Sequence, residues 1–434
     1  MNSVWNLSAV RPYFDSLSNN INVDVLIIGG GIAGILCARA LHDIGADYAL
    51  IEADKICGGI TQNTTAKITI QHGLIYDRLI REFGVKKAKL YYEANSVALN
   101  EYRRLCEAID CDFEECDAHL YSIDNKIKIE KEAQAYKKLG IKAELTDRLP
   151  LPFPVASALC VKGQAQFDPL KFLYQISKDL RIYEDTKAIE VAPNSVMTNR
   201  GEIRAKKIIV ATHFPFINKH GGYFMKMYQH RSYVLALKGA QQINGTYIDE
   251  NIKGLSFRNF GEYLLLGGGS HRTGKQGGNW RELEEFTRKH YPNAKEVCRF
   301  ATQDCMSLDK VPYIGRYSPK AENLYVVSGF NKWGMTSAMV SAIILRDEIS
   351  GKSNKYAELF SPSRSILRPQ LAINAFESAI NLLTPTVPRC PHLGCALKYN
   401  KAERTWDCPC HGSRFAENGQ LIDNPATDDK KPSY

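Results

Sequence analysis

A spaced glycine motif near the N-terminus is the feature that most restricts how this chain folds. An apolar run at residues 23–30, VDVLIIGG, leads into Gly29-x-Gly31-x-x-Gly34, and a helical pattern of apolar residues follows. A second apolar run, YALIE, ends at Glu52. This order predicts the first strand, helix and strand of a doubly wound, Rossmann-like nucleotide-binding domain.

The residues of this motif have distinct roles in such a domain. Gly29 allows the tight turn, Gly31 lets a pyrophosphate approach the backbone, and Gly34 permits close packing of helix on strand. Ala33 lies in the same turn and is a candidate cofactor contact, while Glu52 is placed to accept hydrogen bonds from the adenosine ribose. The alternative is a glycine turn with a purely structural role.

A second fingerprint, for a nicotinamide cofactor, is missing from the sequence. The segment 264–274, LLLGGGSHRTG, follows a predicted strand but places Arg272 where the third glycine belongs. This disfavours a flavin reductase that receives its electrons from NAD(P)H.

Three other segments carry a family resemblance: GGITQNTTAKIT (58–69), LDKVPYIGR (308–316) and VSGFNKWGMTSAM (327–339). They resemble flavin-contacting segments of the D-amino-acid oxidase and glycine oxidase superfamily, and the resemblance spans about residues 20 to 350. It implies FAD as the cofactor and a flavin domain interwoven in sequence with a mixed-sheet substrate domain. It also implies flavin contacts for Thr65, Gly315, Gly334, Met335 and Thr336.

Four cysteines and two histidines are concentrated near the C-terminus. Cys390-x-His392 and Cys408-x-x-His411 each offer one thiolate and one imidazole from a short loop. Such pairs build small zinc sites, and they also build Rieske [2Fe-2S] centres, in which two Cys hold one iron and two His the other.

The residues around these pairs resemble the Rieske family, because CPHLGC matches its first loop and CPCHGS its second. The resemblance implies that Cys390, His392, Cys408 and His411 are the cluster ligands. It further implies that Cys395 and Cys410 form the disulfide that links the two loops.

These patterns predict an α/β chain with α+β character in three parts. Residues 1–351 form the FAD-dependent oxidoreductase part, with a long amphipathic helix over about 83–109 and short strands of a mixed or antiparallel sheet over 157–269. The polar stretch KSNKYAELFSPSRSILRP, with two prolines, is interpreted as the beginning of a linker over 352–385, and 386–434 as a shortened Rieske-type β module. Because that module is short, we expect it to rest on the flavin domain.

The sequence indicates the residues that could contact the substrate less clearly than it indicates the two cofactor motifs. Arg231 and Tyr233, in HRSYVLAL, are candidates to anchor a substrate carboxylate, and His271 to reach the flavin from a glycine-rich loop. The alternatives are an ion-paired arginine and a structural histidine. Trp333 precedes the flavin-facing segment and is a candidate to gate substrate entry, with packing as its alternative.

The net charge and the distribution of cysteines indicate which partners and which cellular compartment to expect. The net charge of +9 comes without a dense Lys/Arg block interleaved with aromatic residues, which argues against nucleic acid and is compatible with a small acidic electron carrier. No secretory leader pattern is visible, and no run reaches about 18 apolar residues, so we expect a cytoplasmic protein without a membrane span. Eight of the cysteines are scattered, unlike a secreted disulfide framework.

The resulting hypothesis is a FAD-dependent oxidoreductase that oxidises a small organic substrate such as an amine or amino acid. Its electrons would pass from FAD through the [2Fe-2S] cluster to an external acceptor. A reductase with reversed flow from a ferredoxin-like donor and a non-catalytic redox sensor are the alternatives. A ring-hydroxylating dioxygenase is excluded because no histidine follows His411 to build a mononuclear iron site there.

Overall fold

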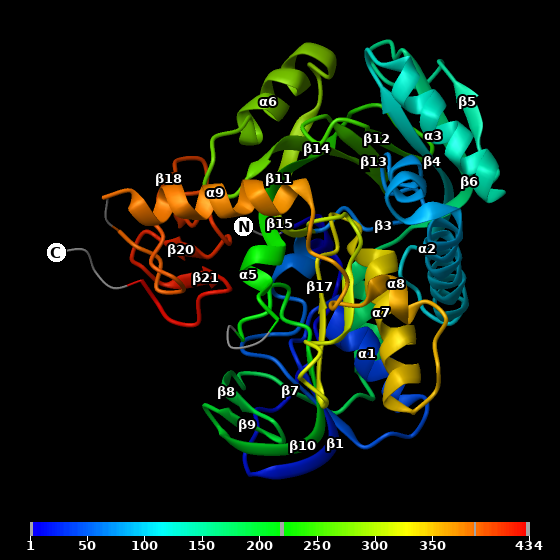
Figure 1. Cartoon of the computed structure of the whole chain (residues 1–434). Coiled ribbons are helices and arrows are strands. Elements are labelled where there is room, and N and C mark those ends of the chain that lie inside the picture. Colours follow the sequence, from blue (N-terminus) through cyan, green and yellow to red (C-terminus); the bar gives the residue numbers. More distant parts are fainter. Residues whose placement is uncertain (1–2, 218–220, 386–387, 431–434) are drawn as a thin grey trace.

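The computed structural model describes residues 3–217, 221–385 and 388–430 (Figure 1). The described chain forms two large sheets and one small C-terminal sheet. Among the described residues, no helix combines the length and the apolar character needed to cross a bilayer.

The first sheet contains the predicted nucleotide-binding unit. Its strands, in spatial order, are β16 (Tyr313–Arg316), β17 (Leu324–Ser328), β10 (Gly201–Val210), β1 (Ile21–Ile28), β2 (Tyr48–Ile51) and β7 (Ile182–Tyr183). From β17 to β7 neighbouring strands are parallel, while β16 is antiparallel to β17. Alternate residues of β1 enter two different apolar clusters, Ile27 on one face and Leu26 on the other. Burial on both faces explains why this strand is a continuous apolar run.

Helices cover one face of this sheet and a hairpin covers the other. The helices α1 (Ile32–His42) and α7 (Gly334–Ile349) pack together in the larger core cluster. The hairpin of β8 (Ala188–Ala192) and β9 (Ser195–Thr198) extends from β10 and packs in the smaller cluster. The parallel, Rossmann-like unit predicted from the glycine motif is therefore confirmed, with a hairpin in place of helices on its second face.

The second sheet is the mixed sheet expected for a substrate domain. Its strands, in spatial order, are β15 (Lys295–Ser307), β11 (Met227–Lys238), β14 (Tyr263–Arg272), β13 (Ser256–Phe260), β12 (Thr246–Asp249), β4 (Glu114–Ser122), β6 (Ser157–Gln166) and β3 (Lys67–Ile68), with β5 (Glu144–Thr146) pairing with β6. All its pairings are antiparallel within the described residues except that of β12 with β4.

Several helices lie around the substrate sheet. The predicted long helix is α2 (Tyr76–Cys106), which begins earlier than expected and is interrupted at Gly84, where φ is 81°. Helices α3 (Lys126–Leu139), α5 (Tyr223–Lys226) and α6 (Asn279–His290) contact strands of this sheet. Helix α4 (Pro169–Ser177) packs instead on α1 and on two short 3₁₀ helices at Val4–Leu7 and Ile60–Asn63.

The C-terminal part contains more helix than the sequence suggested. The stretch 352–385, expected to be a linker, holds α8 (Ala357–Phe360) and α9 (Pro369–Leu383). Pro369 is at the start of α9, where its missing N–H costs nothing, so this proline begins a helix.

The expected module follows as a small antiparallel sheet beside β11 and β15 (Figure 1). Its strands are β18 (Lys398–Asn400), β19 (Thr405–Asp407), β20 (Arg414–Ala416) and β21 (Leu421–Asp423). Residues 386–387 and 431–434 of the expected module lie outside the described residues.

Candidate functional site

A cavity of about 970 Å³ lies between the two large sheets. Its lining includes strand ends of the first sheet, residues of β11, β14 and β15 from the second, and residues 420–424 of the small module. A cavity of this size lies at the upper end of the range for ligand and cofactor sites.

The glycine motif forms one wall of this cavity. Gly29 has φ +112°, and a Cβ there would lie 2.6 Å from the carbonyl oxygen of Ala211 at the end of β10. A Cβ on Gly34 would lie 1.9 Å from the carbonyl oxygen of Gly29, so α1 packs directly on the turn. Gly31 and Ala33 line the cavity at the N-terminus of α1, where exposed amides favour a phosphate.

Glu52 also lines the cavity at the end of β2. One carboxylate oxygen accepts a hydrogen bond from the backbone N–H of Gly30 (2.6 Å), and the other accepts one from Asp54 (3.0 Å). Burial raises the pKa of this carboxyl group, against the lowering effect of these amides. The motif, the turn and the acidic residue therefore have the arrangement that a dinucleotide requires.

The residues proposed from the flavoprotein resemblance separate into two groups. Thr65, Gly334 and Met335 line the cavity. Thr336 is buried behind it, with its Oγ1 3.1 Å from Nε2 of His72. Gly315 is not in the lining: it pairs with Val326 inside the sheet, and a Cβ on it would face Pro362 and Glu348. The geometry of β16 therefore places Gly315 away from this cavity, contrary to our expectation.

Charged side chains face the cavity from the sheet and from the loop before α7. Lys332 donates to Oγ of Ser232 (3.0 Å) and of Ser270 (3.3 Å), and burial lowers its pKa to about 8. Burial raises the pKa of Asp304, on β15, to about 6, while Lys332 acts to lower it. Lys310 donates to the Tyr228 hydroxyl (3.3 Å), and burial lowers its pKa to about 8 as well.

The segment that carries Lys332 is conformationally unusual. Asn331 and Lys332 both have positive φ values, 53° and 75°. Non-glycine residues in this region are uncommon, and they cluster at functional sites. The motif containing Lys332 was visible in the sequence, but the burial of Lys332 and its proximity to Asp304 were not.

Of the candidate reacting residues, Arg231 has a different role from the one considered. Its Nε donates to Oε1 of Glu403 in the small module (3.1 Å), and its Nη2 pairs with Oε2 of the same carboxylate. The Arg231 side chain is 2% exposed, so it is not free to anchor a substrate. Of the two interpretations of Arg231, the structure shows the ion-paired arginine and not the substrate anchor.

Tyr233 and His271 belong to the same contact region. Tyr233 lines the cavity, but its hydroxyl donates to Glu403 (3.0 Å) and lies 3.0 Å from Nε2 of His271. His271 does not line the cavity; its Nδ1 lies 2.9 Å from the carbonyl oxygen of Arg272. Trp333 lines the cavity and stacks on His72 at 4.8 Å.

The two Cys/His loops come together in the small module. Cys390 and Cys408 are buried free thiols close enough to share a hydrogen bond. That bond, together with amides such as that of His392, lowers the pKa of Cys390 to about 7. The rings of His392 and His411 are 5.0 Å apart and nearly perpendicular.

The histidine environment fits a metal cluster. Burial lowers the pKa of His392 to about 4 and that of His411 to about 3, so both rings are neutral at pH 7, as ligands must be. Within the described part of the chain, neither ring nitrogen of the buried His411 makes a hydrogen bond. Two thiols, two neutral imidazoles and backbone amides directed at the sulfurs are the donor set that a [2Fe-2S] cluster of the Rieske type uses.

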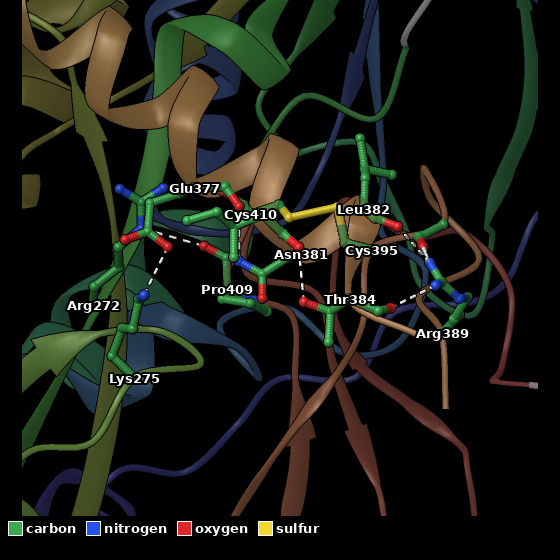
Figure 2. Close-up of a disulfide and its surroundings, with 12 residues drawn as sticks. Arg272, Lys275, Glu377, Asn381, Leu382, Thr384, Arg389, Cys395, Pro409 and Cys410 are labelled. Carbon is green, nitrogen blue, oxygen red and sulfur yellow. Dashed lines mark hydrogen bonds and ion pairs between the residues drawn. A yellow bond between two sulfur atoms is a disulfide. The ribbon is translucent and has the colours of Figure 1, made fainter. Parts of the chain in front are cut away.

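Cys395 and Cys410 form a disulfide, as the resemblance implied, and Figure 2 shows its surroundings. Arg389 donates to the carbonyl oxygens of Leu382 (3.2 Å) and Thr384 (2.7 Å) at the C-terminal end of α9. Helix α9 is therefore joined directly to the first ligand loop, and a cation satisfies its last carbonyl groups.

Two separate parts of the chain match known families. Residues 24–348 match the model of the family described as FAD dependent oxidoreductase. The chain belongs to the FAD dependent oxidoreductase family. Residues 381–433 of this oxidoreductase match the Rieske [2Fe-2S] domain, so its cofactors are FAD and a [2Fe-2S] cluster.

One relative is similar along nearly the whole chain, and others are similar along about four fifths of it. A protein named as a Rieske 2Fe-2S iron-sulfur protein, YhfW of Bacillus subtilis (strain 168), is 36% identical over 97% of this oxidoreductase and 95% of its own length. Gamma-glutamylputrescine oxidoreductase of Escherichia coli (strain K12) is 22% identical over 79% of this chain and 87% of its own. Glycine oxidase from Geobacillus kaustophilus shares the fold, with a TM-score of 0.66 and 16% identity over 79% of this chain and 99% of its own.

Proposed function

We propose that this oxidoreductase oxidises a small amine or amino acid and delivers the electrons, through its Rieske cluster, to an external one-electron carrier. Bound FAD supplies two-electron oxidation and the [2Fe-2S] cluster one-electron transfer. The observation that carries this proposal is that one cavity is lined both by the glycine motif and by residues of the cluster module.

The substrate class is inferred from the charged end of the cavity. Lys332 is positively charged below about pH 8 and can hold a carboxylate, while Asp304 is ionised above about pH 6 and can hold an ammonium group. Around neutral pH the pair is therefore complementary to a substrate with both groups. The names of related proteins, which refer to glycine and to gamma-glutamylputrescine, support the same class.

The carrier is inferred from the second cofactor. A cluster that accepts one electron at a time is suited to a one-electron partner, and the net charge of +9 favours a carrier with an acidic surface.

Anaerobic spectroscopy tests this function. Protein purified without oxygen is expected to contain about two irons and one flavin per chain and to show a Rieske EPR signal after dithionite. It is then mixed with a panel of amines and amino acids, and flavin bleaching is followed together with the EPR signal. Bleaching by a substrate without any reduction of the cluster would show that the relay is wrong, and reduction of both cofactors would support it.

A further inference from the structure

Two adjacent strands, β11 and β15, form a single-layer wall between one part of the cavity and the second ligand loop, while residues 420–424 of the module line another part of the same cavity. Successive side chains of a strand point to opposite faces. On one face of β11 and β15, Gln229, Arg231 and Gln303 contact the module. On the other face, Ser232 and Asp304 line the cavity.

One side chain of this wall joins the cavity to a cluster ligand. The Gln229 side-chain Nε2 donates to the carbonyl oxygen of His411 (3.0 Å) and to that of Asn424 (3.2 Å). Its Oε1 lies 3.1 Å from Nε2 of His213, which lines the cavity just after β10. Gln229 is 1% exposed, so water does not compete for these bonds.

The second ligand loop packs so closely against Gln229 that there is no room for a side chain at Gly412. A Cβ on Gly412, next to the ligand His411, would lie 2.6 Å from the Cβ of Gln229. A Cβ on Gly274 would similarly lie 2.6 Å from the backbone nitrogen of Pro409. The second ligand loop is thus held against the flavoprotein at both of its ends.

From this arrangement we infer that Gln229 is a positioning residue for electron transfer between FAD and the cluster. It fixes the ligand loop of His411 against the wall and provides, with His213, a hydrogen-bonded connection from cavity to ligand. The inference rests on the proposed function: each electron lost by the reduced flavin is gained by the oxidised cluster and then passes to the one-electron carrier. Gln229 neither gains nor loses an electron.

The test compares Gln229→Met with a matched variant, Gln303→Met. Gln303 lies on the adjacent strand and donates to the carbonyl oxygen of Gly412 (2.9 Å), but its Oε1 accepts from Thr273 and does not meet His213. Both substitutions keep side-chain length and remove a donor to a carbonyl oxygen of the second ligand loop. Q229M also removes the contacts with Asn424 and His213, whereas Q303M also removes the one with Thr273. His213→Asn is a second variant, because it breaks the connection from the cavity side without altering the module, and asparagine tolerates the φ of 65°.

The holoenzyme is reduced anaerobically by a light flash with a deazaflavin photoreductant and EDTA, and redistribution of the electron between flavin and cluster is timed by absorbance. Iron and flavin contents and the EPR-monitored cluster potential are measured in each variant. We expect Q229M and H213N to slow the redistribution on the order of tenfold to hundredfold, the scale on which small misplacements act. Q303M is expected to keep the rate, and all variants to retain both cofactors and the potential.

The outcomes are distinct. If Q229M transfers electrons as fast as the unmodified enzyme, or if Q303M is slowed equally, Gln229 has no special positioning role and the inference is overturned. If Q229M loses its cluster, the redistribution rate in H213N is used instead. A rate in H213N equal to that of the unmodified enzyme then overturns the inference. If the unmodified enzyme shows no redistribution at all, the proposed function itself fails, and the inference fails with it.

Discussion

Removing the negative charge of Glu403 is expected to weaken the attachment of the cluster module strongly. The Glu403 carboxylate, 9% exposed, pairs with Arg231 of β11 and with Arg414 of β20. Arg414 has two more carboxylate partners, Asp407 and Asp423. Within the described residues Arg231 has no other ion-pair partner, so Glu403→Gln leaves a buried guanidinium uncompensated.

The magnitude follows from the carboxyl group itself. Burial raises the pKa of Glu403, but Arg231 and Arg414 outweigh it and lower the pKa from 4.5 to about 2. That difference corresponds to about 3 kcal/mol, which agrees with the roughly 3–5 kcal/mol lost when one partner of a buried pair is removed. Because the folded pKa is lowered, this stabilisation is present above about pH 4.5 and is lost as the pH falls towards 2.

The assay is urea denaturation, monitored through the visible absorption of the cluster. E403Q is expected to lower the urea concentration at the midpoint of unfolding. Glu262→Gln is the control, because Glu262 pairs with Lys238 of the same strand β11 but both side chains are more than half exposed. Such a pair contributes less than about 1 kcal/mol. Combining E403Q with R231M should recover part of the loss, since no unpaired charge remains at Arg231. An E403Q midpoint as high as that of E262Q would refute this reasoning.

Three further predictions address the cofactors and the substrate. Cys408→Ser should abolish bound iron, measured by an iron assay, while FAD still binds when it is supplied; iron at the unmodified level would contradict the ligand assignment. Gly34→Ala should lose FAD, measured by flavin fluorescence after gel filtration, because its Cβ would lie 1.9 Å from a carbonyl oxygen; stoichiometric flavin would argue against the packing described. Binding of acetate, detected as a shift of the flavin spectrum, should weaken as the pH rises through about 8, where Lys332 loses its proton. Lys332→Met should remove this pH dependence. If the variant kept the pH profile of the unmodified enzyme, Lys332 would not be the group that binds the carboxylate.

The parts that could be predicted from the sequence are those determined over short distances. The glycine motif predicted a strand, turn and helix because Gly34 must pack on Gly29 five residues earlier, a contact that the structure confirms. The Cys/His loops were recognisable for the same reason: each loop carries its thiolate and imidazole within three residues of one another.

The features that could not be predicted depend on distant partners. Glu403 lies 172 residues from Arg231, and nothing in the strand around Arg231 indicates that its partner comes from the cluster module. Gly315 was assigned by resemblance alone, and only the pairing of β16 with β17 shows which way it faces. In 352–385 the prolines suggested a linker, although a proline at the first position of a helix, as at Pro369, is equally compatible with the pattern.

The module residues that line the flavin cavity link the maturation of the two cofactors. Asn424 donates to the carbonyl oxygens of Thr212 (2.7 Å) and Phe214 (2.8 Å), and Lys187 donates to that of Thr427 (2.7 Å), so this segment closes over the cavity only when the module is folded and docked. A chain without its cluster lacks part of the stabilisation of that fold and should therefore release FAD more readily. Cells grown with little iron would then produce an enzyme depleted in flavin as well, which flavin-to-protein ratios measured across a range of iron supply would reveal. Iron availability would in that way govern the amount of the complete enzyme.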